Sequence, residues 1–288
     1  FFIYEKNKLT IKKYWDLNYT IDYNHSTTYF ERKLRTLMDE SISLHQVSDV
    51  RIGSYLSGGI DSSLMTRLAH ESNPLFYGCF HGRFPEYPGY DESSYAQQLA
   101  DELNIPLHYI DITANDFVDN IENVIYHLDY PTAGPGAFAQ FMVSKLASQH
   151  VKVVIGGQGG DELFGGYARY VVAYFEQCIK AAIEGTHKDG RFVVTPESII
   201  PNLSMLQEYK PMIEMLWKEG LFGPLDERYF RLINRANDSC DEIHWSLFDK
   251  MDLQEQFKQL FNNPNYVNNN AYFDKMTRFD LKYSLPSL

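Results

Sequence analysis

Residues 50–63 read VRIGSYLSGGIDSS and join a strand-like apolar run to a turn with two adjacent glycines. Adjacent glycines let backbone N–H groups turn toward one point, and the helix expected after them adds N–H groups of its own. The hydroxyl groups of Ser57, Ser62 and Ser63 can donate to phosphate oxygens, and the Asp61 carboxylate can hold a divalent cation. No lysine follows the glycines, so the stretch is not the GxxxxGK[ST] phosphate loop. It predicts an anion cradle, with an ordinary strand–turn–helix connection as the alternative.

The composition of the chain fits a soluble globular protein. Of its 288 residues 44% are hydrophobic and 22% are charged. The formal net charge of −12 argues against nucleic-acid binding, because phosphate backbones demand clustered Lys and Arg. No run approaches the ~20 apolar residues of a membrane span, and the three cysteines show no metal spacing. These features predict a cytoplasmic protein with neither nucleic acid nor membrane as a partner.

Strand-like and helical segments alternate through the first half of the chain. Strands are expected at residues 50–56, 74–80, 107–112 and 151–155. Helices are expected at residues 28–44, 62–71, 92–103, 117–128 and 137–149. Such alternation predicts an α/β fold with a parallel, doubly wound sheet and helices on both faces. Ligands bind such sheets at the carboxyl ends of the strands. After residue 185 the pattern becomes mainly helical.

A second glycine-rich motif, GGQGGDELFGGY at residues 156–167, follows the last expected strand. It holds six glycines in eleven residues, a density that indicates close approach of the backbone to a ligand or to another segment of the chain. Alone it is compatible with a flexible hinge carrying a solvated acidic pair. Together with the first motif, on another strand end of the same sheet, it predicts that Asp61 and Asp161 converge on one Mg²⁺ bridging phosphate oxygens.

These motifs resemble the synthetase domain of glutamine-hydrolysing, B-type asparagine synthetases, which belong to the PP-loop ATP pyrophosphatases. The resemblance is good over residues 1–180 and looser beyond. The segments that carry it are residues 8–17, 57–63, 90–112, 125–157 and 156–170. It implies three regions: a linker or small hairpin from a glutaminase domain (1–27), a PP-loop ATP-binding α/β core (28–184), and a mainly helical extension (185–288). The chain begins without Met and ends in a running apolar pattern, so we expect a piece of a longer protein, truncated at its C-terminal end.

The resemblance also implies a chemistry. Such enzymes adenylate a side-chain carboxylate, by default that of aspartate, with release of pyrophosphate. Ammonia from the glutaminase domain then displaces AMP to leave an amide, and homo-oligomers are possible. Mg²⁺ and ATP are the implied cofactors, with Asp61 and Asp161 as metal ligands. By motif position the residues implied to hold or border ATP are Leu56, Ser57, Gly58, Gly59, Asp61, Ser62, Cys79, Phe80, Gly156 and Gly157.

Some positions depart from the family pattern. Gln158 stands where the family commonly has Glu or Asp, a carboxylate thought to act as a base in amide formation. An amide cannot take a proton at neutral pH, so Gln158 is a candidate for orienting the intermediate instead. Tyr130 and Gly134 are further substitutions at which specificity could differ. The segment that supplies a basic catalytic residue in the family is expected past Leu288.

Two alternatives to an asparagine synthetase therefore stay open. One is a related amidotransferase acting on another carboxylate, such as a sugar acid or a precursor in secondary metabolism. The other is a non-catalytic nucleotide-binding module, favoured by Gln158 and disfavoured by the intact SGGIDSS motif. Other PP-loop chemistry, such as NAD synthesis or tRNA thiolation, fits less well, because the sequence shows no basic face and no reactive cysteine arrangement.

Overall fold

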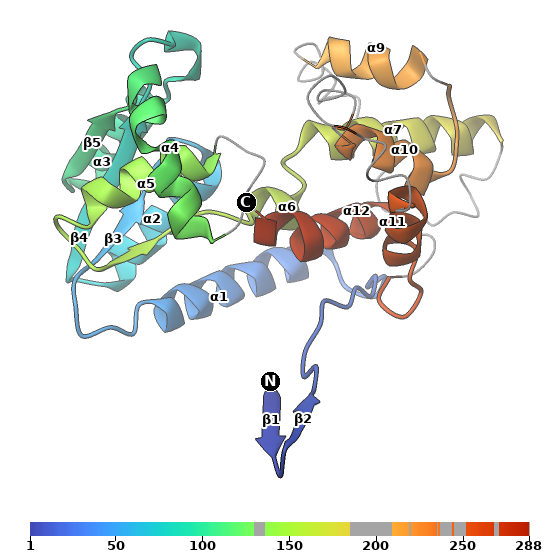
Figure 1. Ribbon diagram of the computed structural model, residues 1–288, viewed down its shortest axis with the longest axis horizontal. Coiled ribbons are helices and arrows are strands. Elements are labelled where there is room, and N and C mark those ends of the chain that lie inside the picture. The colour runs from blue at the N-terminus through green and yellow to red at the C-terminus, as the bar shows by residue number, and fades with distance from the viewer. Residues whose placement is uncertain are drawn as a thin grey trace. The chain divides into compact units, whose positions relative to one another are not determined.

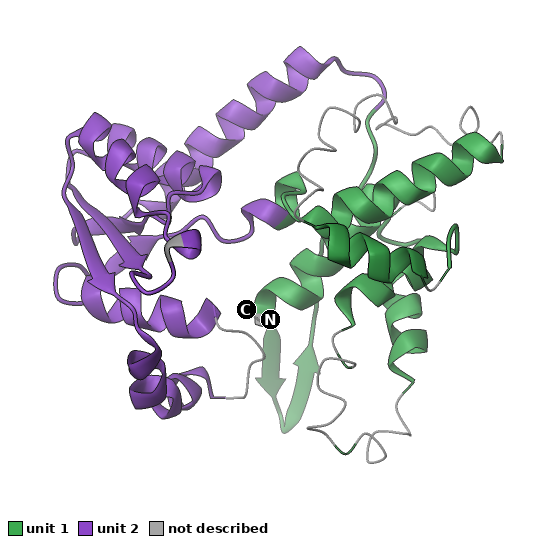
Figure 2. Cartoon of the chain, turned by 90° about the horizontal axis from the view of Figure 1, so that it is seen from above, with its two compact units in different colours: residues 1–22, 162–286 green, residues 23–161, 287–288 purple. Residues whose placement is uncertain are grey.

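The computed structural model describes residues 1–129, 136–184, 209–218, 220–234, 236, 244, 252–267 and 271–287. Its chain forms two compact units, coloured separately in Figure 2. One unit comprises residues 23–161 with 287–288, and the other comprises residues 1–22 with 162–286. Tyr130, Gly134 and the first part of the expected helical extension, residues 185–208, lie outside the described residues.

A four-stranded parallel sheet organises the unit that contains residues 23–161, as Figure 1 shows. Its strands are β3 (Ile52–Tyr55), β4 (Phe76–Arg83), β5 (Leu107–Asp111) and β6 (Val153–Ile155), in the order β5-β4-β3-β6. The helices of this unit are α1 (Thr27–His45), α2 (Ile60–Ser72), α3 (Ser93–Leu103), α4 (Ala114–Leu128) and α5 (Gly136–Ala147), with a 3₁₀ turn at Pro88–Tyr90. The predicted α/β fold with a parallel sheet is confirmed.

Alternation along the strands directs side chains to both faces of the sheet. Cys79 of β4 packs with Leu56 and with Ala96 of α3 on one face. The next residue, Phe80, packs with Ala147 at the end of α5 on the other face. Because successive strand residues point to opposite faces, apolar residues in sequence require helices on both sides. The expected doubly wound arrangement follows from this pattern.

The strand order creates a reversal point between β3 and β6. From β3 the chain runs outward to β4 and then to β5, and it returns to the other side of β3 to form β6. Crevices that bind ligands in open α/β sheets open at such a reversal, beyond the carboxyl ends of the strands. The SGGIDSS motif follows β3 and the GGQGG motif follows β6, so both lie at this point.

The other unit is mainly helical. Its helices are α7 (Ala168–Ile183), α9 (Lys210–Lys218), α10 (Leu225–Ile233), α11 (Leu253–Phe261) and α12 (Tyr272–Phe279), continued by a π-helical turn (Asp280–Ser284) and a 3₁₀ turn (Leu285–Ser287). The short α6 (Gly160–Phe164) spans the boundary, and β1 (Phe2–Glu5) pairs antiparallel with β2 (Lys8–Ile11). Helix α7 contributes Tyr170, Ala173 and Cys178 to the core of this unit. Residues 168–183 therefore group with the helical region by their contacts.

Buried polar groups tie the helical unit together. The carboxylate of Asp280 is fully buried and accepts hydrogen bonds from Tyr170 and Tyr229, both at 2.6 Å, and from Arg169 Nη2 at 2.6 Å. A second pair joins Arg228 Nε to Glu176 Oε1 at 2.6 Å, with both side chains nearly inaccessible. Charged groups this deeply buried need complete pairing, which these contacts supply.

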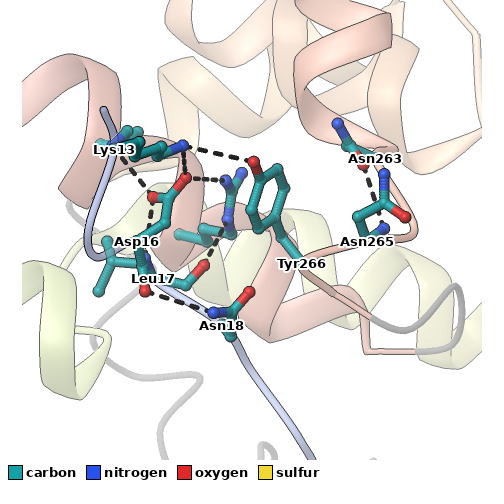
Figure 3. A network of polar contacts seen from close by, with 9 residues as sticks. Lys13, Asp16, Leu17, Asn18, Asn263, Asn265 and Tyr266 are labelled. Atoms are coloured by element: carbon teal, nitrogen blue, oxygen red, sulfur yellow. Dashed lines mark hydrogen bonds and ion pairs between the residues drawn. The ribbon is translucent and has the colours of Figure 1, made fainter. Parts of the chain in front are cut away.

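Figure 3 shows how residues 13–18 attach to the same unit. The Asp16 carboxylate accepts hydrogen bonds from Lys13 and lies 3.0 Å from Lys282 Nζ. Although burial acts to raise it, these hydrogen bonds lower the pKa of Asp16 below its ordinary value. Arg278 Nε donates to the Leu17 carbonyl at 3.1 Å. Among the residues that the structure describes, no helix combines the length and apolar character needed to cross a bilayer.

Candidate functional site

The turn after β3 requires glycine at its second position. Gly58 has φ +100°, in the left-handed region that favours glycine. A Cβ atom there would lie 2.8 Å from the Glu92 carbonyl oxygen and 3.1 Å from Tyr95 Cβ, so the turn also packs closely against the start of α3. Glycine at position 58 is therefore needed both for the backbone conformation and for close packing.

Hydrogen bonds within the motif fix the shape of the turn. The Ser62 hydroxyl accepts from Ser57 N at 3.2 Å and donates to the Gly59 carbonyl at 3.1 Å. Ser57 Oγ lies 2.9 Å from Ser62 Oγ and accepts from Gly59 N at 3.2 Å. Two of the three hydroxyl groups predicted to bind phosphate, those of Ser57 and Ser62, thus stabilise the turn.

The start of α2 leaves its first N–H groups to an outside acceptor. Gly59 caps the helix with no side-chain hydrogen bond, and the first bond within the helix runs from Ser63 N to the Gly59 carbonyl at 3.1 Å. The N–H groups of a first helical turn have no acceptor within their own helix. Together with the positive end of the helix dipole, they form an arrangement that suits a phosphate.

The second glycine motif packs directly on this helix start. A Cβ on Gly157 would lie 2.7 Å from Ser62 N and 2.9 Å from the Asp61 carbonyl carbon. A Cβ on Gly160 would lie 2.3 Å from Asp61 Oδ2. The Asp61 carboxylate therefore lies against the residue that precedes Asp161. Two motifs that are about a hundred residues apart in sequence are in van der Waals contact through their glycines.

The donor set at this point suits Mg²⁺ together with a nucleotide. Among the described residues, no group of three or more His, Cys, Asp or Glu side chains gathers as a metal site. Two carboxylates with phosphate oxygens and water completing the coordination are what Mg²⁺ usually accepts, whereas it is seldom held in an all-protein cage. Asp61 and Asp161 carry the kind of donor that this role requires, and the Asp61 carboxylate lies against Gly160, the neighbour of Asp161 in sequence. Their binding of Mg²⁺ stays a prediction.

Gln158 lies between these close contacts and is exposed. Its neighbour Gly159 has φ +91°, so the backbone reverses immediately after it. Gln158 Nε2 donates to Gln140 Oε1 of α5 at 2.6 Å. Gln140 lies within a segment that carries the family resemblance, residues 125–157, but no spacing in that segment singled out its side chain.

The strand residues of the expected site are deeply buried. Leu56, Cys79 and Phe80 are each at most 1% exposed. Burial raises the pKa of the Cys79 thiol to about 11. His81, which sequence reasoning passed over, donates from Nδ1 to the Leu56 carbonyl at 2.7 Å. Its Nε2 is buried and has no hydrogen-bond partner among the described residues. A Cβ atom on Gly156 would lie 3.6 Å from the Tyr55 ring.

Comparison with known families agrees with this geometry. The family model described as asparagine synthase matches residues 33–288, nearly the whole chain. The chain belongs to the asparagine synthase family. Family membership extends over both compact units, including the helical region that the sequence motifs alone covered loosely.

Curated relatives match about half of this chain. An asparagine synthetase (glutamine-hydrolyzing) 1 of Bacillus subtilis is 37% identical over 139 residues, which is 48% of this chain and 22% of that protein. Asparagine synthetase B of Escherichia coli is 31% identical over 150 residues, which is 48% of this chain and 27% of that protein. The amidase chyE of Penicillium rubens is 31% identical over 173 residues, and the match covers 54% of this chain and 26% of that protein. The matched part is thus about a quarter of each relative's length.

Among solved structures, an NH3-dependent NAD synthetase from Campylobacter jejuni aligns with 84% of this chain and 95% of its own. The sequence identity is 17% and the TM-score is 0.32. The fold assignment depends on the strand order and the glycine contacts of this chain itself.

Proposed function

We propose that this chain is the synthetase part of an ATP-dependent amide-forming ligase of the asparagine synthase family. Its substrate would be a small molecule with a carboxylate, by default aspartate. The ammonia would come from glutamine hydrolysed elsewhere in the full-length protein, as the printed names of the curated relatives suggest. Because the chain spans about a quarter of those relatives, the activity is proposed for the full-length protein.

The reaction has two balanced steps. In the first, a carboxylate oxygen attacks the α-phosphorus of ATP, the α–β phosphoanhydride bond breaks, and pyrophosphate leaves with the bonding electron pair. In the second, the nitrogen of ammonia attacks the acyl carbon, the bond from that carbon to the AMP oxygen breaks, and AMP leaves with the electron pair. One proton from the former ammonia is released to solvent, and the product is an amide.

One observation carries the proposal: the glycine contacts bring the two motifs together at the reversal point of the sheet. The SGGIDSS turn, stiffened by Ser57 and Ser62, offers N–H groups to the departing pyrophosphate. Asp61 and Asp161 would hold Mg²⁺, which would offset the negative charge of the phosphates. Leu56 is expected to hold ATP together with the SGGIDSS turn, and the part of β4 around Cys79 and Phe80 is expected to flank the adenine. Gly156 and Gly157 are expected to border the adenosine and the adenylate.

A second candidate is a related amidotransferase that acts on a different carboxylate. Gln158 favours it, because the side chain expected to act as a base is an amide here. Relatives named as amidases, from Penicillium rubens and Gibberella zeae, also show that sequences of this similarity are not all named asparagine synthetases. Two other positions at which specificity could differ, Tyr130 and Gly134, lie outside the described residues.

Product analysis tests the proposal. The full-length protein is incubated with Mg²⁺, ATP and ammonium, and with aspartate or one of a panel of other carboxylates. AMP and pyrophosphate formed only with aspartate, with asparagine as the third product, would support the first candidate. The same nucleotide products with a different carboxylate would support the second. ADP as the nucleotide product, or no product with any carboxylate, would overturn both.

A further inference from the structure

The side chain of Gln158 is held by a residue on a different element. Its Nε2 donates to Gln140 Oε1 at 2.6 Å. Gln140 lies in the second turn of α5 and is half-buried, whereas Gln158 is exposed. The contact joins two residues 18 positions apart and uses one polar atom of each amide.

Gln140 is itself fixed relative to the site. Its carbonyl accepts a hydrogen bond from Ser144 Oγ at 2.6 Å, and Ser144 Oγ lies 2.7 Å from the hydroxyl of Tyr55. Tyr55 is the last residue of β3, two residues before the SGGIDSS turn. The chain of contacts therefore connects the end of one motif strand, through α5, to the glutamine of the other motif. These contacts fix the backbone of α5 at Gln140, and the Gln140 side chain is held by its hydrogen bond with Gln158.

The direction of the hydrogen bond determines what Gln158 offers to a ligand. Once Nε2 is engaged by Gln140, the Oε1 atom of Gln158 remains as an acceptor. An amide oxygen cannot take up a proton at neutral pH, but it can accept an N–H hydrogen bond and so orient the lone pair of an attacking amine. This role needs no titrating group at position 158.

We propose that Gln140 is a positioning residue for amide formation: it holds Gln158 so that Oε1 accepts an N–H bond from the incoming ammonia. The inference rests on the proposed function and concerns only its second step. Ammonia forms the C–N bond, AMP leaves with the electrons of the broken C–O bond, and the proton goes to solvent and not to Gln158. The first step, release of pyrophosphate, does not involve either glutamine.

Three substitutions separate this role from a structural one. Gln140→Glu keeps an acceptor for Gln158 Nε2 and preserves the orientation. Gln140→Met has a similar length and no hydrogen-bonding group. Gln140→Lys offers only donors, so it would bind Oε1 and turn the Gln158 amide around. The matched control is Gln97→Met on α3, where the exposed Gln97 donates only to Asp101 on its own helix at 2.8 Å.

The readout is the amount of amide formed per pyrophosphate released during the first turnover of the full-length protein, at several ammonium concentrations. Pyrophosphate reports the first step of the reaction and amide reports the second. This ratio does not depend on the fraction of folded enzyme, because a loss of folded protein lowers both products equally. We expect Q140M and Q140K to lower the ratio at limiting ammonium by about tenfold, the worth of one well-formed hydrogen bond. Q140E and Q97M should stay within about twofold of the unaltered protein.

Three results would overturn the inference, and they are distinguishable. If the unaltered protein makes AMP and amide but Q140M and Q140K keep its ratio, Gln140 has no positioning role and the proposed function stands. If Q140E falls as far as Q140M, orientation of the amide is not what matters, which also refutes the inference alone. If the unaltered protein forms no AMP with any carboxylate, the proposed function fails and the inference fails with it.

Discussion

Replacing Gly157 with alanine tests whether the contact between the two glycine motifs is required. The new Cβ would lie 2.7 Å from Ser62 N and 2.9 Å from the Asp61 carbonyl carbon, both backbone atoms at the start of α2. Ordinary contacts begin near 3.4 Å, so one motif must retreat by about 0.7 Å. Backbone at a helix start cannot rotate away as a side-chain end can.

Two consequences follow from that displacement. Overpacking of this kind costs about 1–3 kcal/mol in the free energy of unfolding. A misplacement approaching 1 Å at a reacting centre lowers the rate by about tenfold to a hundredfold. We therefore expect Gly157→Ala to lower the melting temperature moderately and to lower kcat/KM for carboxylate-dependent pyrophosphate release by at least about tenfold.

The assay compares thermal unfolding and pyrophosphate release for Gly157→Ala and for Gly89→Ala. Gly89 lies in a 3₁₀ turn, and a Cβ there would meet no atom within 4 Å. Gly89→Ala should change the free energy of unfolding by at most about 0.5 kcal/mol and the rate of pyrophosphate release by at most about twofold. If Gly157→Ala releases pyrophosphate as fast as Gly89→Ala does, the two motifs do not form one site and the reasoning is wrong.

Four further changes have defined outcomes. Asp61→Asn should reduce pyrophosphate release about a hundredfold or more with a small effect on folding, as checked by product analysis and circular dichroism. Folding lowers the pKa of Asp16 below its ordinary value of 3.8, so the ionised carboxylate stabilises the fold fully above that pH, and this contribution is lost as the pH falls below it. Asp16→Asn should therefore lower the free energy of unfolding at pH 7. It should also make that free energy depend less on pH in acid unfolding experiments. Cys79, with a pKa raised to about 11, should react with iodoacetamide at pH 8 only after denaturant is added. Arg228→Met leaves Glu176 buried without its partner and should cost about 3–5 kcal/mol of unfolding free energy in urea titrations.

Much of the sheet and of the nucleotide cradle was predictable from the sequence. Strand-like runs of apolar residues identified β3 to β6, because each is short and flanked by glycine or by helical patterns. Placing both glycine motifs behind strands was sufficient to put them at one edge of a parallel sheet. The structure adds that they touch, and that Asp61 lies against Gly160.

Other features depend on contacts that no local pattern encodes. Gln140 reaches Gln158 only because α5 packs across β4 and β5 of the sheet. His81 is buried under the Leu56 carbonyl by the pairing of β3 with β4. The polar cluster around Asp280 joins residues up to 111 positions apart. Helix α7 follows the second motif directly in sequence, yet its aromatic side chains pack with α10 and α12, so composition does not show to which unit it belongs.

The most direct test of the central claim follows an oxygen atom. The proposed function requires a carboxylate oxygen to attack the α-phosphorus of ATP at the site formed by the two glycine motifs. With the accepted carboxylate labelled with ¹⁸O, turnover of the full-length protein should place one labelled oxygen in AMP and none in pyrophosphate. Unlabelled AMP, or label appearing in inorganic phosphate together with ADP, would contradict adenylation and with it the proposed function.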